Sequence, residues 1–235
     1  GLGDVYKRQT VYTVDLLGCG RSDKSSITYT NFVYVQMISD FIKKIIGQKT
    51  DVIASGFSGS FVTMACHNEK ELFNKIMLVN PPSLTQLKQM PNRKDRLLKA
   101  ALEIPIFGTL VYHMIVSRDN INNLFIEKMY YNPFHVDNQM ADAYYEAAHK
   151  GGYYTRFLYS SLAAKYININ ICHALKALDN SIYIVEGETE PNGKAVTDDY
   201  CASNPAIEVS VLKETKHLPH VEAPEAFLEQ VKIFF

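Results

Sequence analysis

The sequence of 235 residues has almost no net charge, because 24 lysines and arginines stand against 25 aspartates and glutamates. It also has no block of basic residues interleaved with aromatic side chains, which a groove for nucleic acid requires. We therefore predict that the protein does not bind nucleic acid.

Cysteine is scarce, and the four that occur lie far apart, with no Cys-x-x-Cys pair: Cys19, Cys66, Cys172 and Cys201. This spacing favours reduced thiols over a disulfide framework or a zinc site. The sequence thus predicts a cytoplasmic protein.

Long apolar runs are also missing. The longest, IPIFGTLVYHMIV at residues 104–116, contains a proline, a glycine and a histidine. It is shorter than the ~20 apolar residues that cross a bilayer, so we predict no transmembrane segment.

The first nine residues, GLGDVYKRQ, read like the translation of a sequencing adapter. We interpret residues 1–9 as non-native, with the protein proper beginning near Thr10.

Short apolar segments rich in β-branched residues alternate with amphipathic ones. The strand patterns cover residues 10–18, 51–55, 75–82, 181–187 and 206–212, and the helical patterns cover residues 31–47, 61–73 and 225–235. Strands that alternate with helices predict a mostly parallel α/β sheet with helices on both faces.

Residues 84–177 interrupt this alternation. They show several helical patterns, no convincing strand and many tyrosines. We predict that this segment is a helical insertion between the two parts of a core, residues 10–83 and 178–235.

Three segments, taken together, resemble the α/β-hydrolase superfamily. They are DLLGCGRSD at residues 15–23, ASGFSGSF at residues 54–61, and GETEP at residues 187–191 followed by KHLPHVEAPEAF at residues 216–227. The resemblance is to esterase- and lipase-like members, and it implies that residues 84–177 form a helical lid. It also implies that the chain is truncated at its N-terminus, because the early strands that carry part of the oxyanion hole are missing.

The resemblance assigns the general base to His217, which follows the last predicted strand, while we take the neighbouring His220 as structural. A histidine can hold and release a proton near neutral pH. Glu190 occupies the place of the acid that orients this histidine. Nearby carboxylates that could serve instead are Glu188, Asp198 and Asp199.

The nucleophile is ambiguous, because two registers fit the turn in which an α/β-hydrolase carries its nucleophile between small residues. Ser58 has Gly56 and Ser60 as small neighbours, but Phe61 follows them. Position 56 fits the spacing better, yet it is a glycine and has no oxygen for attack. Three alternatives remain: Ser58 acts in a shifted turn, Ser55 or Ser58 acts from beside a glycine apex, or the site has lost covalent chemistry.

Catalysis by a serine is the reading that we place first, since the histidine loop is intact. The serine would attack an acyl carbonyl, His217 would take its proton, and Glu190 would hold the imidazole. The amide of Phe57 or Gly59 would stabilise the oxyanion, depending on the register.

We therefore predict a serine hydrolase that acts on an ester or related acyl substrate, with no cofactor and no metal. The alternative is an inactive ligand-binding or receptor-like homologue with Gly56 at the nucleophile position. The aromatic residues of the helical segment suggest a small apolar acyl or aromatic substrate. We interpret Gly18-Cys19-Gly20 as a turn, because no third glycine follows at the spacing of a nucleotide site.

Overall fold

The computed structural model describes residues 10–235, so the nine residues interpreted as non-native lie outside the described part. Four parallel strands form one sheet in chain order. They are β1 (Thr50–Ser55), β2 (Phe73–Val79), β3 (Ile182–Gly187) and β4 (Glu208–Leu212). The predicted mostly parallel α/β class is confirmed.

The register brings the carboxyl ends of the strands to one edge of the sheet. Ser55 lies opposite Val79, and Gly187 lies opposite Leu212. The segments that follow these residues therefore meet at that edge, although they are far apart in the sequence.

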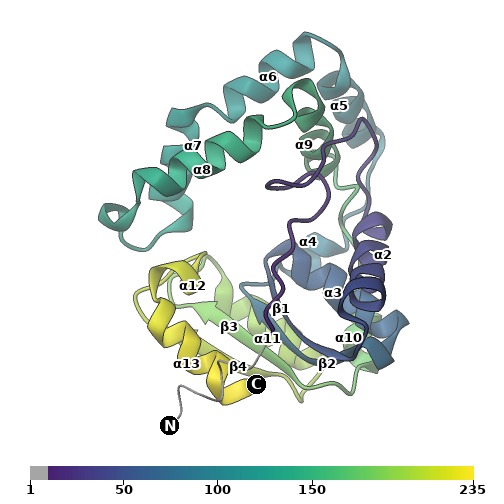
Figure 1. The fold of residues 1–235 in the computed structure, drawn as a ribbon, viewed down its shortest axis with the longest axis vertical. Coiled ribbons are helices and arrows are strands. Elements are labelled where there is room, and N and C mark those ends of the chain that lie inside the picture. The colour runs from purple at the N-terminus through teal and green to yellow at the C-terminus, as the bar shows by residue number, and fades with distance from the viewer. Residues whose placement is uncertain (1–9) are drawn as a thin grey trace.

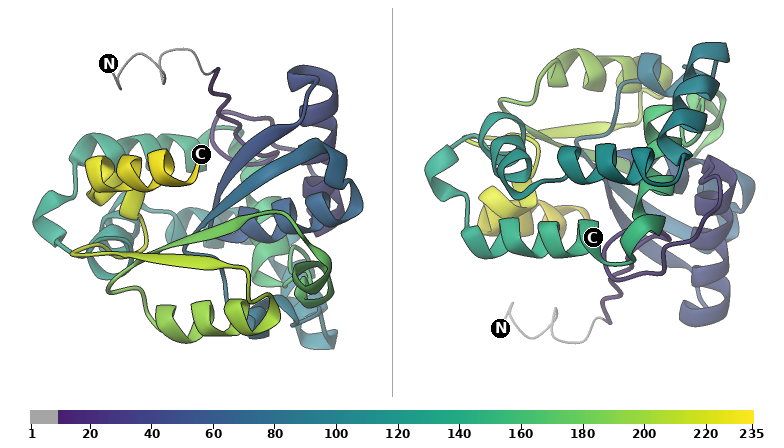
Figure 2. Two further views of the ribbon diagram at one scale, coloured as in Figure 1. Left: turned by 90° about the horizontal axis from the view of Figure 1, so that it is seen from below. Right: turned by 90° about the horizontal axis from the view of Figure 1, so that it is seen from above.

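Successive side chains of a strand point to opposite faces of the sheet, so the buried strands present apolar side chains on both faces. Helices cover both of these faces. Ile76 and Leu78 face the larger core, as do Ile182 and Ile184 of β3. The helices α2 (Asn31–Phe41), α3 (Phe57–Asn68), α10 (Cys172–Ala177) and α11 (Gly193–Ser203) contribute further residues to that core. On the other face, α13 (Pro224–Phe234) packs against Met77, Tyr183 and Val185. Figures 1 and 2 show α13 beside the sheet.

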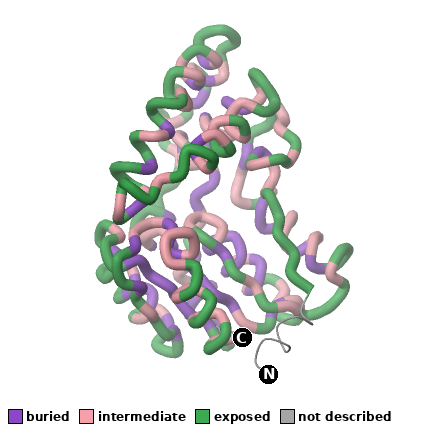
Figure 3. The backbone as a smooth tube through the Cα atoms, turned by 60° about the vertical axis from the view of Figure 1, so that its left-hand side comes forward, coloured by how far each residue is buried: buried purple, intermediate pink, exposed green. Residues whose placement is uncertain are grey.

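The chain between β2 and β3 contains no strand among the residues that the structure describes. Before α10, its α-helices are α4 (Leu84–Leu87), α5 (Arg93–Glu103), α6 (Phe107–Ile115), α7 (Arg118–Leu124), α8 (Asn138–His149) and α9 (Thr155–Ala163). In Figure 1, α5 to α9 arch away from the sheet. Figure 3 shows that buried residues concentrate around the sheet and that much of the arch is exposed.

Short helical turns complete the fold. The two π-helical turns are η1 (Ile42–Ile46) and η3 (Phe125–Met129), and the three 3-10 turns are η2 (Lys70–Leu72), η4 (Pro133–His135) and η5 (Gly152–Tyr154). A short helix, α12 (Pro219–Glu222), precedes α13.

Two predicted elements differ from the structure. The strand predicted over residues 10–18 is absent, and residues 10–15 are exposed. An isolated segment cannot form a ladder, and β1 to β4 pair only with one another. The helix predicted over residues 61–73 spans Phe57–Asn68 instead, since the turn at Gly56 starts it earlier and Phe73 opens β2.

Candidate functional site

The candidate site lies at the carboxyl edge of the sheet. Gly56 follows β1, Glu190 follows β3 by a short turn, and His217 lies in the loop after β4. Ligands of parallel α/β proteins bind at this edge, where loops from separate strands converge. The sheet therefore brings together residues that the sequence analysis selected from three distant segments.

Gly56 forms the sharp turn between β1 and α3. Its backbone has φ 57° and ψ −133°, a conformation that residues with side chains rarely adopt. The Gly56 N–H donates to the Val79 carbonyl at 2.9 Å, which ties the turn to β2. A Cβ atom added at Gly56 would meet no atom within 4 Å. The apex of the turn thus carries no side chain, although there is room for one.

The serines beside this turn make local hydrogen bonds. Ser58 lies in the first turn of α3, and its hydroxyl donates to the Ser55 carbonyl at 2.7 Å. Ser60 is fully buried, and its hydroxyl donates to the Phe57 carbonyl at 2.7 Å. Within residues 10–235, neither the Ser55 nor the Ser58 hydroxyl forms a hydrogen bond with His217. In this conformation no serine is prepared for proton transfer to the histidine.

The start of α3 presents backbone amides at the same turn. The first N–H groups of a helix have no intrahelical acceptor, and no side chain caps α3. The Gly59 N–H already donates to the Gly56 carbonyl at 3.1 Å. Of the two amides considered for an oxyanion, that of Phe57 is therefore better placed to bind a ligand oxygen. The positive end of the helix dipole favours such an oxygen.

His217 and Glu190 form a hydrogen-bonded pair. Glu190 Oε1 lies 3.1 Å from His217 Nδ1, and both side chains are partly exposed. The other carboxylate oxygen of Glu190, Oε2, is buried and has no hydrogen-bond partner among residues 10–235. Glu188 points elsewhere, because its carboxylate accepts the Glu214 N–H at 3.0 Å. A carboxylate at Nδ1 orients the imidazole and leaves Nε2 for a ligand.

Asn80 holds the histidine loop, and the sequence analysis did not select it. Its side-chain amide donates to the carbonyls of Lys216 and His217, at 2.8 and 3.0 Å. Its side-chain oxygen accepts the Gly187 N–H at 3.0 Å. Asn80 is buried, with φ 42°, directly after β2. A polar residue between an apolar strand and two prolines was the available signal.

Glu222 ties the same loop to the helical segment. Its carboxylate accepts the Lys216 N–H at 2.7 Å and the Tyr131 N–H at 2.6 Å. The His217 N–H donates to the Met129 carbonyl at 3.1 Å. The backbone of His217 is thus held from the sheet side and from the helical side.

A second carboxylate lies on β3, the strand that precedes Glu190. Glu186 of β3 is buried, and burial raises the pKa of its carboxyl group, as do the charges of Glu190 and Asp198. A Cβ atom on Gly193 would lie 2.1 Å from Glu186 Oε1, so this glycine permits the close approach of α11. The pKa of His220 is lowered, mainly because its imidazole is partly buried. Repulsion from His217 lowers this pKa further.

The loop with the Gly18-Cys19-Gly20 sequence is closed by its own contacts. Asp15 Oδ2 accepts the Arg21 N–H at 2.8 Å, and the Ser22 hydroxyl donates to the Asp15 carbonyl at 2.6 Å. The Lys24 ammonium donates to the Ser22 carbonyl at 3.0 Å. These contacts agree with a turn.

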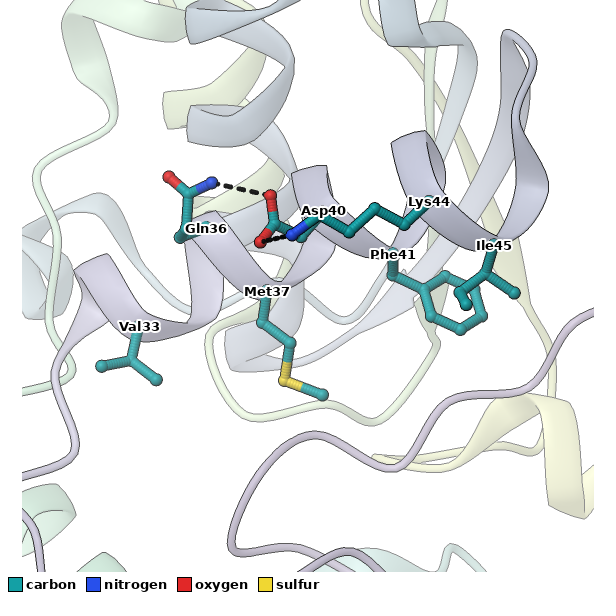
Figure 4. Close-up of a pocket in the computed structure, with 7 residues that line it drawn as sticks. All are labelled: Val33, Gln36, Met37, Asp40, Phe41, Lys44 and Ile45. Atoms are coloured by element: carbon teal, nitrogen blue, oxygen red, sulfur yellow. Dashed lines mark hydrogen bonds and ion pairs between the residues drawn. The ribbon is translucent and has the colours of Figure 1, made fainter.

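A surface hollow of about 530 Å³ runs along one side of α2 and η1. Figure 4 shows its apolar floor, which is formed by Val33, Met37, Phe41 and Ile45. It includes none of the site residues described above. Among residues 10–235, no group of three or more histidine, cysteine, aspartate or glutamate side chains could hold a metal ion.

Comparison with known proteins identifies a family. The model of the alpha/beta hydrolase family matches residues 3–230. No curated protein matches the sequence.

Solved structures share the fold at low sequence identity. An esterase from Exiguobacterium antarcticum has a TM-score of 0.69 at 13% identity, covering 94% of this chain and 79% of the esterase. A 2-hydroxy-6-oxo-6-phenylhexa-2,4-dienoate hydrolase from Rhodococcus has a TM-score of 0.71 at 16% identity, covering 94% and 78%. A bromoperoxidase from Bacillus anthracis has a TM-score of 0.71 at 11% identity, covering 94% and 79%.

Proposed function

Because the chain belongs to the alpha/beta hydrolase family, we propose that it binds a small acyl compound at the carboxyl edge of the sheet without forming an acyl-serine intermediate. The observation that carries this proposal is the backbone of Gly56, which has φ 57° at the apex of the turn. The hydroxyl of Ser58, one of the two candidate nucleophiles, donates to the Ser55 carbonyl instead. The chain would thus be a ligand-binding or receptor-like homologue.

The ligand that suits this site carries a carbonyl or carboxylate oxygen on an apolar acyl or aromatic body. The Phe57 amide at the start of α3 can donate to that oxygen, and His217 Nε2 is left for a second polar group because Glu190 occupies Nδ1. The names of the structural neighbours support this class, since they include an esterase and a hydrolase of a phenyl-substituted dienoate.

Serine hydrolysis through Ser58 is the second candidate, and the hydrogen bond between His217 and Glu190 favours it. Ser58 Oγ would leave the Ser55 carbonyl and bond to the acyl carbon, while His217 Nε2 takes the hydroxyl proton. Collapse of the tetrahedral intermediate would release the alcohol, which receives that proton. Water activated by His217 would then cleave the acyl-serine to the acid and free serine.

The remaining predictions belong to the same proposal. Residues 84–177 would act as a lid, supported by the hydrogen bond from the His217 N–H to the Met129 carbonyl. The protein would be cytoplasmic, which its four free cysteines support. Neither a metal nor a cofactor has a part in this proposal.

Restoring a hydroxyl at the apex tests the proposal. Gly56→Ser adds a side chain where a Cβ meets no atom within 4 Å. We expect this variant to react with a fluorophosphonate probe and to hydrolyse p-nitrophenyl acetate about a hundredfold faster than the unaltered chain. Gly56→Ala is the matched control, because it adds the same Cβ and the same backbone strain without the hydroxyl.

The two candidates predict opposite results for the unaltered chain. Binding without acylation predicts no labelling of it, and loss of the Gly56→Ser labelling when His217→Ala is added. Labelling of the unaltered chain that Ser58→Ala abolishes would contradict this proposal and establish the serine mechanism.

A further inference from the structure

The helices α5 and α6 and the turn between them expose several large apolar residues. They are Leu97, Leu98, Ile104, Ile106, Phe107, Leu110 and Met114. Here we call them the elbow surface. In Figure 1 these two helices lie at the end of the molecule away from the sheet. Apolar patches of this kind on a folded protein mark interaction sites.

The turn between the two helices is strained. Ile106 has φ 65° and ψ −65°, and the Phe107 N–H donates to the Pro105 carbonyl at 2.8 Å. These values define a rare, strained γ-turn, and a β-branched residue at positive φ is an outlier. The turn leaves the Ile106 side chain 86% exposed. Strain that holds an apolar side chain in solvent suggests a functional constraint.

The inner sides of the helices are firmly supported by α9. Arg156 donates to the Glu103 carbonyl at 3.3 Å and to the Thr109 hydroxyl at 3.2 Å. The Ser160 hydroxyl donates to the Glu103 carboxylate at 2.8 Å, and Lys99 pairs with that carboxylate. These contacts therefore hold α5 and α6 in place beneath the elbow surface.

The charges beside the elbow surface are positive. Arg93, Lys94 and Arg96 are exposed around Leu97, and none of them forms an ion pair within residues 10–235. The two carboxylates of residues 93–115 are both neutralised: Asp95 by Lys165, and Glu103 by Lys99. Basic residues beside exposed apolar ones suit a surface that is anionic outside and apolar beneath.

The lengths of the helices decide between lying on a membrane and crossing it. No single helix of the described residues is long and apolar enough to cross a membrane. The helices α5 and α6 reach that length and apolarity only when taken together, and the pair is bent by 97°. At ~1.5 Å per residue, helices of 11 and 9 residues are each far shorter than a hydrocarbon core of ~30 Å. The bent pair can insert its tip and keep its basic end among the headgroups.

We propose that the elbow surface docks the protein on an anionic lipid bilayer, with Ile106 and Phe107 entering the interface and Arg93, Lys94 and Arg96 contacting headgroups. This inference is independent of the reaction, if any, at Gly56. It concerns a face of the helical segment that contains none of the site residues.

Vesicle binding by the full chain tests the inference. We expect sedimentation with phosphatidylcholine vesicles that contain phosphatidylserine, and weak binding to phosphatidylcholine alone. Replacing Arg93, Lys94 and Arg96 together by Gln should weaken binding about a hundredfold. The charge-matched control replaces three exposed lysines elsewhere by Gln: Lys176, Lys194 and Lys213.

A second variant isolates the apolar contribution. Phe107→Gln with Leu110→Gln should weaken binding about tenfold or more, because their side chains no longer enter the interface. Phe32→Gln with Ile233→Gln is the control, since these exposed side chains lie on α2 and α13.

Binding that both elbow variants lose and both controls retain supports the inference. The inference is overturned if the unaltered chain does not bind anionic vesicles or binds neutral vesicles equally well. It is also overturned if the control variants weaken binding as much as the elbow variants do. Self-association that Phe107→Gln with Leu110→Gln abolishes, without vesicle binding, would identify a second copy of the chain as the partner instead.

Discussion

At the scale of the residue, position 56 controls what the candidate site can do. The turn keeps a backbone geometry that strains any side chain, yet the residue there is glycine. Ser58 is only two residues away, but it lies within α3 and bonds to the Ser55 carbonyl. Proximity in sequence therefore does not replace the apex hydroxyl, because the turn presents only position 56.

Glu186 should make stability depend on pH. In the folded state, burial raises the pKa of its carboxyl group above the ordinary value of a glutamate. As pH rises past this value, the unfolded chain loses the proton first, so the free energy of unfolding falls until the folded carboxyl also ionises. Glu186→Gln replaces this ionisable carboxyl group by a neutral amide. We expect the variant to gain stability relative to the unaltered chain as pH rises from about 4 to neutral.

Urea unfolding across this pH range measures the effect. Glu188→Gln is a suitable control, because its side chain is exposed on the following turn and accepts the Glu214 N–H. A stability difference between Glu186→Gln and the unaltered chain that stays constant with pH would contradict the prediction.

At the scale of the element, hydrophobic pattern predicted the four strands and the core helices α2, α3 and α13, but it did not predict α11. These patterns succeeded because β2 and β3 are almost wholly buried, which requires continuous apolar runs. The pattern at residues 10–18 is similar, but a strand also needs a neighbour. None of the four strands of the sheet pairs with it.

Gly108 should determine the angle between α5 and α6. A Cβ atom there would lie 1.8 Å from the Leu102 carbonyl oxygen, a clash with backbone that no side-chain rotation relieves. We expect Gly108→Ala to lower the free energy of unfolding by about 1–3 kcal/mol in urea titrations. Gly47→Ala is an instructive comparison, since Gly47 has φ 73° and open space around it.

Gly47→Ala should therefore cost about 1–2 kcal/mol through backbone conformation alone. The two variants differ in what they displace. Only Gly108→Ala should increase hydrogen exchange in α5 and α6. Equal exchange in these helices for both variants would show that the close approach at Gly108 does not hold the bend.

At the scale of the whole molecule, the helical segment and the sheet meet around Leu218. This side chain packs with Ile121, Phe125 and Tyr130 in a buried cluster separate from the main core. The neighbouring His217 N–H donates to the Met129 carbonyl. The loop that carries the histidine is therefore also the loop on which the helical segment rests.

Leu218→Ala should loosen that contact. We expect a loss of about 2–4 kcal/mol in the free energy of unfolding of the cluster. Hydrogen exchange should rise first in residues 116–145, while β2 and β3 stay protected. Leu87→Ala is the control, because Leu87 is buried in the main core. Equal loss of protection in the sheet and in residues 116–145 after Leu218→Ala would contradict a separable contact.

The sequence by itself determined the α/β class, the alternating elements, the long helical segment and the short set of residues around Gly56, Glu190 and His217. These features depend on composition, local periodicity and motifs, which are properties of neighbouring residues. The family resemblance rests on the same local strings.

Only the tertiary structure decided how these residues meet. It paired Glu190, and not Glu188, with His217, directed the Ser58 hydroxyl to a backbone carbonyl, and introduced Asn80 as the clamp of the histidine loop. Asn80 lies 137 residues from His217 in the chain. Contacts of this range depend on strand register and loop closure, for which no local pattern carries the information.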